Sequence, residues 1–361
     1  MVACGERATR TDSAGGPFSL IWYDLIEAAV PFARRCRNRR LPQMATGAES
    51  WLPRRGAPVA ASTDRIDHAC FYTGTPELPI YVDVLQPAGG DAAPPLLLLH
   101  GGFHTGTCYL TTPDGRPGWA RRFAEQGRRV FVADWPGHGR SPMFDGFAAM
   151  TSAAMARSFA ALLVRTGPVV LLAHSAGGPF AWWLAEHDPD RVLGIVGVAP
   201  GPPPEMAVPQ PRSAGAEPGF DGKPGGVARV DPGRPVYVGR EFIRYSWTNA
   251  PQFPHEAFDA YASSIVPESA MLLNERFGFA SSGLALSDPA SVAKRPILVV
   301  TGEHDPRHSR ALDQATARYL GADFVWLPDA GIVGNGHLLM IERNSDEIAG
   351  LVASWLSEHG L

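Results

Sequence analysis

Short apolar runs alternate with segments of helical spacing over most of this chain. Helical spacing covers residues 119–126, 150–166, 180–187 and 348–358. The apolar runs, expected to be strands of a buried sheet, are residues 95–100, 129–134, 169–174, 192–198, 296–301 and 323–327. Residues 80–85 instead alternate apolar and polar positions, which is typical of an antiparallel strand. Strands that alternate with helices predict an α/β fold with a mostly parallel central sheet and helices on both faces.

Two segments do not follow this alternation. Residues 201–292 interrupt it and are expected to form a cap inserted into the fold, while residues 1–65 form an N-terminal extension. The α/β core is therefore predicted to comprise residues 66–200 and 293–361. The second half of the insertion is rich in aromatic residues, which either line a pocket or pack the cap onto the sheet.

Composition narrows the class of partner. Of the 361 residues, 45% are hydrophobic, and 32 basic against 36 acidic side chains give a net charge of −4. Binding of nucleic acid needs a basic excess, so we expect a small-molecule substrate instead. No apolar run reaches the roughly 18 residues of a membrane-spanning helix, so no membrane span is expected. The oligomeric state stays open, a homodimer included.

The N-terminus and the cysteines suggest a cytoplasmic protein. The apolar stretch 18–32 is interrupted by Asp24 and Glu27 and lacks a cleavage site for a signal peptidase. The four cysteines form no C-x-x-C pair, which argues against a metal or redox motif. Reduced thiols are expected. Export, with a disulfide between Cys70 and Cys108, remains the alternative.

The most informative string is Ala-His-Ser-Ala-Gly at residues 173–177, where an apolar strand turns into a helix. Small residues around a serine allow the sharp turn that presents a nucleophile above a sheet. We therefore expect Ser175 to be a nucleophile. The backbone N–H of Ala176, at the start of the helix, would face the negative charge that develops during attack.

A serine nucleophile needs a base and an acid that orients the base. His337 follows the last strand and precedes the last helix, which places it at the edge of the sheet where such sites assemble. Asp305 comes just after another buried strand and completes the order Ser, Asp, His. Glu303 and Glu205 are the alternative acids.

A second backbone donor is expected from the His-Gly-Gly-Phe string at residues 100–103, because glycine lets the backbone approach a substrate closely. Gly102 is the first candidate for this oxyanion hole and Phe103 the second. His104, Tyr109 and Trp247 are candidates for the substrate pocket, with ordinary packing as the alternative.

Together these residues resemble the α/β-hydrolase superfamily. The strings at residues 111–119 and 331–337 are similar to those of a subgroup of bacterial serine esterases. In that subgroup the acid of the triad is a Glu at the position of Ala199, so the resemblance leaves the acid to Asp305 or Glu205. The subgroup also has a cysteine pair in its oxyanion loop, where this chain has Gly102 and Phe103.

The expected function is a serine hydrolase that cleaves a carboxylic ester of a small, apolar or aromatic substrate through an acyl-enzyme. The resemblance implies no metal and no organic cofactor. A cofactor-free lyase or a carbon–carbon bond hydrolase on the same scaffold is the second hypothesis, because this chain has Ala199 where the esterase subgroup has the acid of its triad. A non-catalytic ligand-binding protein is the third, although such a protein would not need all three of Ser175, Asp305 and His337.

Overall fold

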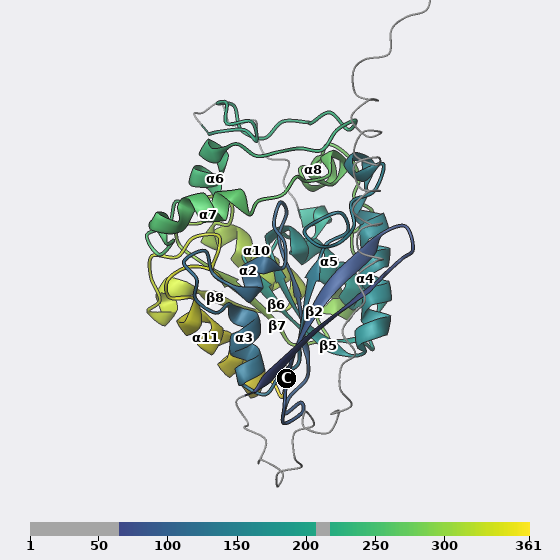
Figure 1. Ribbon diagram of the computed structural model, residues 1–361, viewed down its shortest axis with the longest axis vertical. Helices are drawn as coiled ribbons and strands as arrows, with labels where there is room; N and C mark the ends of the chain where they lie inside the picture. Colours follow the sequence, from purple (N-terminus) through teal and green to yellow (C-terminus); the bar gives the residue numbers. More distant parts are fainter. Residues whose placement is uncertain (1–64, 207–216) are drawn as a thin grey trace, which may run out of the picture. The chain divides into compact units, whose positions relative to one another are not determined.

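The computed structural model describes residues 65–206 and 217–361, and its strands form one sheet in the order β1-β2-β4-β3-β5-β6-β7-β8 (Figure 1). Strand β2 pairs antiparallel with β1 and β4, and the other neighbours are parallel. The strands are β1 Ile66–Gly74, β2 Pro79–Pro87, β3 Leu96–Leu99, β4 Val130–Asp134, β5 Val169–His174, β6 Val192–Val198, β7 Ile297–Thr301 and β8 Asp323–Trp326.

The sheet is buried on both faces, as the apolar runs predicted. In β3, Leu96 and Leu98 belong to one hydrophobic cluster and Leu97 and Leu99 to another, and all four are fully buried. Because successive side chains of a strand point to opposite faces, the two clusters lie on the two sides of the sheet. The predicted fold class is therefore confirmed.

Helices cover both faces. Phe123 of α3 and Val352 of α11 pack in the first cluster, while Phe159 of α4, Leu184 of α5 and Leu320 of α10 pack in the second. Figure 1 shows α4 at the right of the view and α3 and α11 at its lower left. The helices are α2 Thr107–Leu110, α3 Trp119–Glu125, α4 Ser152–Thr166, α5 Gly178–His187, α6 Arg240–Ser246, α7 Phe258–Ser263, α8 Ala270–Arg276, α9 Pro289–Val292, α10 Arg310–Leu320 and α11 Ser345–Glu358.

Strand β1 and helix α10 are among the elements that were not expected from the sequence. Strand β1 is an edge strand whose residues 67–70 are exposed, so its side chains follow no alternation that would reveal it. Helix α10 begins after Ser309, whose side chain accepts a hydrogen bond from the Leu312 N–H. This helix buries only a narrow stripe of side chains, which includes Ala317 and Leu320. Its mean hydropathy is therefore low, and its sequence does not stand out as a helix that packs on the core.

The inserted segment, defined here as residues 217–292, carries α6 to α9. Figure 1 shows α6, α7 and α8 at one end of the sheet. The N-terminal extension lies outside the described residues except for Arg65. Within the described ranges, no helix has the length and apolar character needed to cross a membrane. Cys70 and Cys108 are free thiols, so the alternative disulfide between them is not formed.

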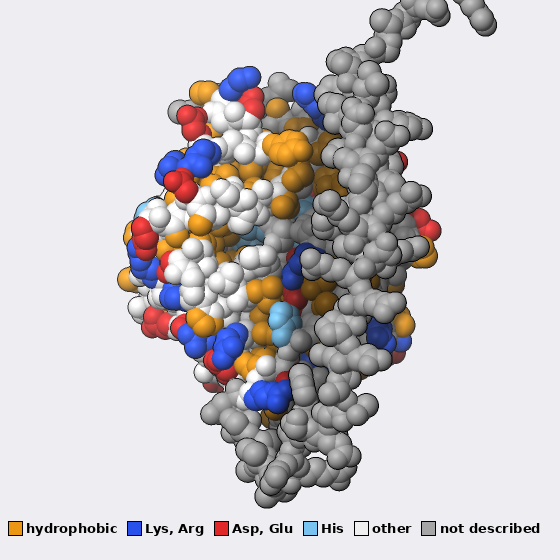
Figure 2. Space-filling model, viewed as in Figure 1, with side chains coloured by type: hydrophobic (Ala, Val, Ile, Leu, Met, Phe, Trp, Pro, Cys, Tyr) orange, Lys and Arg blue, Asp and Glu red, His pale blue; other side chains and the backbone are white. Residues whose placement is uncertain are grey.

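Charged side chains of both signs are interspersed on the face of the molecule that Figure 2 shows. Many of them pair across the surface, as Arg122 does with Asp346 and Arg310 with Asp329. Such exposed pairs contribute little to stability. Most of the stabilisation of the fold therefore comes from the two hydrophobic clusters.

Replacing Leu98 by Ala should lower the free energy of unfolding by about 2–5 kcal/mol, because it opens a cavity in the first cluster. Val164→Ala, at an exposed position of α4, is the matched control and should change it by about 0.5 kcal/mol or less. Chemical denaturation of both variants measures the difference. Equal effects of the two substitutions would contradict the assignment of Leu98 to the core.

Candidate active site

The chain turns sharply at Ser175, between β5 and α5. Ser175 has φ +50°, in the left-handed region that a side chain rarely adopts, and it opens a short 3-10 turn over residues 175–177. A Cβ on Gly178 would lie 2.5 Å from the Gly201 carbonyl oxygen, and one on Gly101 would lie 3.0 Å from the Ser175 Cβ. The small residues around the serine are therefore needed for the loops to approach it.

The structure brings Ser175, His337 and Asp305 together. The Ser175 Oγ lies 3.0 Å from His337 Nε2, and His337 Nδ1 lies 2.6 Å from Asp305 Oδ2. A carboxylate only accepts hydrogen bonds, so Nδ1 carries the proton and Nε2 is left to accept the Ser175 hydroxyl. His337 and Asp305 are both buried, while Ser175 is half-buried.

Asp305 is held in its ionised form. Burial opposes the charge, but the nearby His337 and His308 and the hydrogen bonds to the carboxylate lower the pKa of Asp305 to about 2. Its Oδ1 accepts the backbone N–H groups of Arg307 at 2.8 Å and His308 at 3.2 Å. The carboxylate is thus fixed in charge and orientation toward His337.

The alternative acids lie elsewhere. Glu303 Oε1 accepts the Gly334 N–H at 2.6 Å, and Glu205 accepts the Tyr319 hydroxyl at 2.9 Å. Neither has a hydrogen bond or ion pair with His337 among the described residues, whereas Asp305 has one. Ala199 is fully buried at the end of β6, with φ +41°.

The oxyanion loop, residues 100–103, is fixed by hydrogen bonds to its carbonyls. His100 Nδ1 donates to the Gly101 carbonyl at 2.7 Å, and His104 Nδ1 donates to the Gly102 carbonyl at 2.7 Å. The Phe103 N–H donates to the Glu268 carboxylate at 3.3 Å, so it is not free to bind a substrate. This corrects the expectation that Phe103 could supply the second donor.

Two backbone donors remain at the site. The Gly102 N–H has no acceptor within the part of the chain that the structure describes. Ala176 lies in the first turn after Ser175, where an N–H has no partner in its own helix. Gly102 and Ala176 both line the same cavity as Ser175 and His337. Their N–H groups are the donors available to a substrate oxygen.

A cavity of about 660 Å³, called here the main cavity, opens at Ser175. His104 and Trp247 line it, and so do the inserted-segment residues Phe220 and Phe242. Tyr109 does not: it is fully buried and its hydroxyl donates to the Leu99 carbonyl at 3.0 Å, so the expectation of a pocket role was wrong.

Comparison with known proteins agrees with this architecture. A model of the alpha/beta hydrolase family matches residues 96–351. The chain belongs to this family. It is 28% identical over 358 residues to the "probable secreted lipase phiG" of a fungal species, covering 80% of this chain and 89% of the relative.

Solved structures share the fold of this α/β hydrolase. A bacterial esterase superposes with a TM-score of 0.54 at 18% identity, covering 83% of this chain and 98% of that one. The carboxylesterase CesB of Bacillus subtilis superposes with a TM-score of 0.53 at 17% identity, covering 82% and 94%. At these identities the likeness shows the fold.

Two buried histidines that support the site of this hydrolase were missed from the sequence. His174 Nε2 donates to the backbone carbonyl of His337 at 2.9 Å. The His308 ring stacks on the His337 ring with centroids 5.3 Å apart, and its Nδ1 lies 3.1 Å from Asp313. His174 stands inside the serine string and His308 three residues after Asp305, so proximity to these motifs was the available signal.

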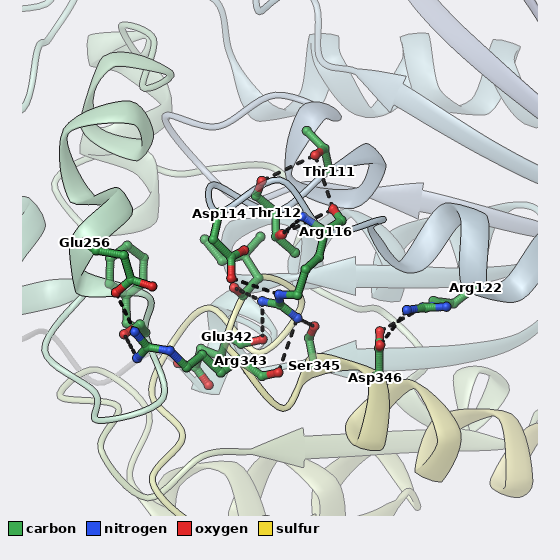
Figure 3. A network of polar contacts seen from close by, with 12 residues as sticks. Thr111, Thr112, Asp114, Arg116, Arg122, Glu256, Glu342, Arg343, Ser345 and Asp346 are labelled. Atoms are coloured by element: carbon green, nitrogen blue, oxygen red, sulfur yellow. Dashed lines mark hydrogen bonds and ion pairs between the residues drawn. The ribbon is translucent and has the colours of Figure 1, made fainter.

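The loop that carries His337 is anchored from two sides. Glu342 accepts the side-chain N–H of Asn335 at 2.6 Å and the backbone N–H of Gly336 at 2.8 Å. Arg116 donates to the carbonyls of Ile341, Glu342 and Arg343. Figure 3 shows Arg116 beside Glu342 and Arg343. The string at residues 111–119 thus serves to hold the loop that follows His337.

One group of described residues has the spacing of a metal site. Ligand atoms of Asp305, His308 and His337 lie within 4.8 Å of one another. Asp305 Oδ2 and both ring nitrogens of His337 already take part in the contacts with each other and with Ser175. A metal ion here would have to break those contacts.

Glu342 should make stability depend on pH. Burial raises its pKa to about 7, against an ordinary value of 4.5. Between these values the unfolded chain releases a proton that the folded chain keeps, so the free energy of unfolding falls by up to about 3 kcal/mol as the pH rises. Glu342→Gln should lose less stability over this window than the unmodified protein.

Denaturation of both proteins at pH 4.5 and at pH 7.5 measures this difference. Glu358→Gln, at an exposed position near the end of α11, is the control and should follow the unmodified protein. Parallel pH dependence of all three proteins would contradict a raised pKa of Glu342.

Proposed function

We propose that this α/β hydrolase is a serine esterase that cleaves carboxylic esters through an acyl-enzyme. The proposal rests above all on the chain of two hydrogen bonds that links Ser175 to His337 and His337 to Asp305 inside the main cavity. Such a chain activates a serine that would otherwise be a poor nucleophile at neutral pH.

In the first half of the reaction, the Ser175 Oγ bonds to the ester carbonyl carbon while its proton moves to His337 Nε2. The carbonyl oxygen becomes an oxyanion that accepts the N–H groups of Gly102 and Ala176. The carbon–oxygen bond to the alcohol then breaks, and the departing oxygen takes the proton from Nε2. Asp305 stabilises the imidazolium that forms between these two transfers.

In the second half, water replaces the alcohol. His337 takes a proton from the water as its oxygen bonds to the acyl carbon, and the same two N–H groups hold the new oxyanion. The bond to Ser175 Oγ breaks, and Nε2 returns the proton to the serine. No step of this cycle requires a group beyond the chain, the ester and water.

The main cavity suits a small apolar or aromatic ester. Phe220, Phe242 and Trp247 of the inserted segment contribute aromatic walls to the cavity that Ser175 also lines. A cavity of about 660 Å³ lies in the range of small-molecule sites. We assign the inserted segment the role of a cap that encloses the substrate.

A fluorophosphonate probe tests the nucleophile. The probe should form one covalent adduct, on the peptide that contains Ser175, and the Ser175→Ala variant should form none. Mass mapping of the labelled peptide is the measurement. Ser141→Ala, which removes a buried hydroxyl outside the cavity, is the control and should still be labelled. An adduct elsewhere, or none, would contradict the serine esterase proposal.

A pair of acid variants tests the triad. Asp305→Asn should lower kcat by about 10³- to 10⁴-fold, because the neutral amide no longer stabilises the imidazolium of His337. Glu205→Gln should retain turnover within a few-fold, since its contacts are with Tyr319 and the Leu286 N–H. Steady-state hydrolysis of an aryl ester measures both. The reverse ranking would assign the acid to Glu205.

A further inference from the structure

A buried ion pair lies behind the oxyanion loop. Glu268, immediately before α8, is fully buried, and Arg276 ends that helix. One carboxylate oxygen of Glu268 accepts the Ser269 N–H at 2.9 Å and lies 3.2 Å from His138 Nε2. The other accepts the Phe103 N–H and lies 3.5 Å from Arg276 Nη2. The carboxylate therefore accepts three hydrogen bonds and lies beside the His138 ring, whose Nδ1 donates to the Pro136 carbonyl.

The guanidinium of Arg276 packs against the oxyanion loop at Gly102. A Cβ placed on Gly102 would lie 2.4 Å from Arg276 Nη1 and 3.0 Å from Nη2. Gly102 and Arg276 both line the main cavity, while Glu268 lies behind its wall. The same Cβ would lie 2.9 Å from Glu268 Oε2, so both charges of the ion pair stand beside Gly102, and the guanidinium is the one that lines the main cavity.

Most N–H groups of the Arg276 guanidinium have no hydrogen-bond acceptor among the described residues. The 3.5 Å contact with Glu268 is the one hydrogen bond or ion pair of Arg276 among the described residues, and it is long for a charged pair. Three-quarters of the side chain is removed from solvent, and burial lowers the pKa of Arg276. The remaining donors of the guanidinium keep contact with solvent at the wall of the main cavity, so the acceptors of a bound molecule can replace that water.

The acidic residues of the cavity do not meet this need. Each of them accepts a hydrogen bond from another part of the chain: Glu205 from Tyr319, Glu217 from Tyr245, and Glu275 from the Ser152 N–H. Arg307, the other arginine of the cavity, donates to Ser246 and lies over the Phe242 ring. Glu268 is thus the one acceptor of Arg276 among the described residues, and a bound molecule can supply another.

We propose that Arg276 binds a carboxylate of the substrate, so that the preferred ester carries a carboxylate near its scissile carbonyl on an otherwise aromatic or apolar body. A carboxylate offers two oxygens to the paired N–H groups of a guanidinium. Aromatic side chains such as Trp247 would hold the body of the molecule. This inference rests on the proposed esterase function, because it places the carboxylate relative to Ser175.

Matched ester pairs test the inference. We expect the enzyme to hydrolyse meta- or para-acetoxybenzoate with a higher kcat/KM than the corresponding methyl ester, which lacks the charge. In Arg276→Met this preference should fall by about 10- to 100-fold, the effect of losing a charged hydrogen-bonded contact. Arg276→Lys keeps the positive charge but loses the paired N–H groups, so its preference should lie between that of the unmodified enzyme and that of Arg276→Met. Arg318→Met, at an exposed position of α10, should keep the preference.

Ligand binding provides a readout that does not need the reaction. The meta- and para-hydroxybenzoate products should raise the melting temperature of the Ser175→Ala variant, and adding Arg276→Met should abolish this shift. An unchanged preference and an unchanged shift in the Arg276 variants would overturn the inference and leave the esterase proposal intact. Loss of Ser175 labelling with a retained shift would overturn the esterase proposal instead.

Discussion

The left-handed turn at Ser175 is the constraint on which the rest of the site depends. A backbone at φ +50° costs a non-glycine residue of the order of 1–2 kcal/mol. The turn persists because the surrounding loops close on it: the Gly201 N–H donates to the Ser175 carbonyl at 2.7 Å. Gly101 and Gly178 allow those loops to come close enough. The hydroxyl consequently stands within hydrogen-bond distance of His337, a residue 162 positions away.

Buried histidines do much of the positioning around this turn. Burial lowers the pKa of His100, His104 and His174, which keeps these rings neutral, with one donor and one acceptor nitrogen each. His100 donates to the Gly101 carbonyl and accepts the Trp135 N–H, and His104 donates to the Gly102 carbonyl. These bonds fix the peptide planes of the oxyanion loop, and the N–H of Gly102, which lines the main cavity, is left without an acceptor among the described residues.

Local pattern was enough to predict most of the sheet and to single out Ser175, which directly follows a fully buried apolar strand, and His337, which lies between the last strand and the last helix. The mixed sheet also contains β1, which was missed because an exposed edge strand carries no alternation. Tyr109 was misassigned since its helix directs the ring into the core. Glu268 and Arg276 could not be predicted, because their contacts with the oxyanion loop join residues more than 160 positions apart.

The acyl-enzyme is the central claim, and trapping it is the most direct test. The enzyme would be quenched in acid during turnover of an aryl acetate, digested and examined by mass spectrometry. The account predicts that the peptide containing Ser175 carries one acetyl group, at an occupancy that rises when Asp305→Asn slows its hydrolysis more than its formation. Continued turnover with an unmodified Ser175 peptide would contradict it.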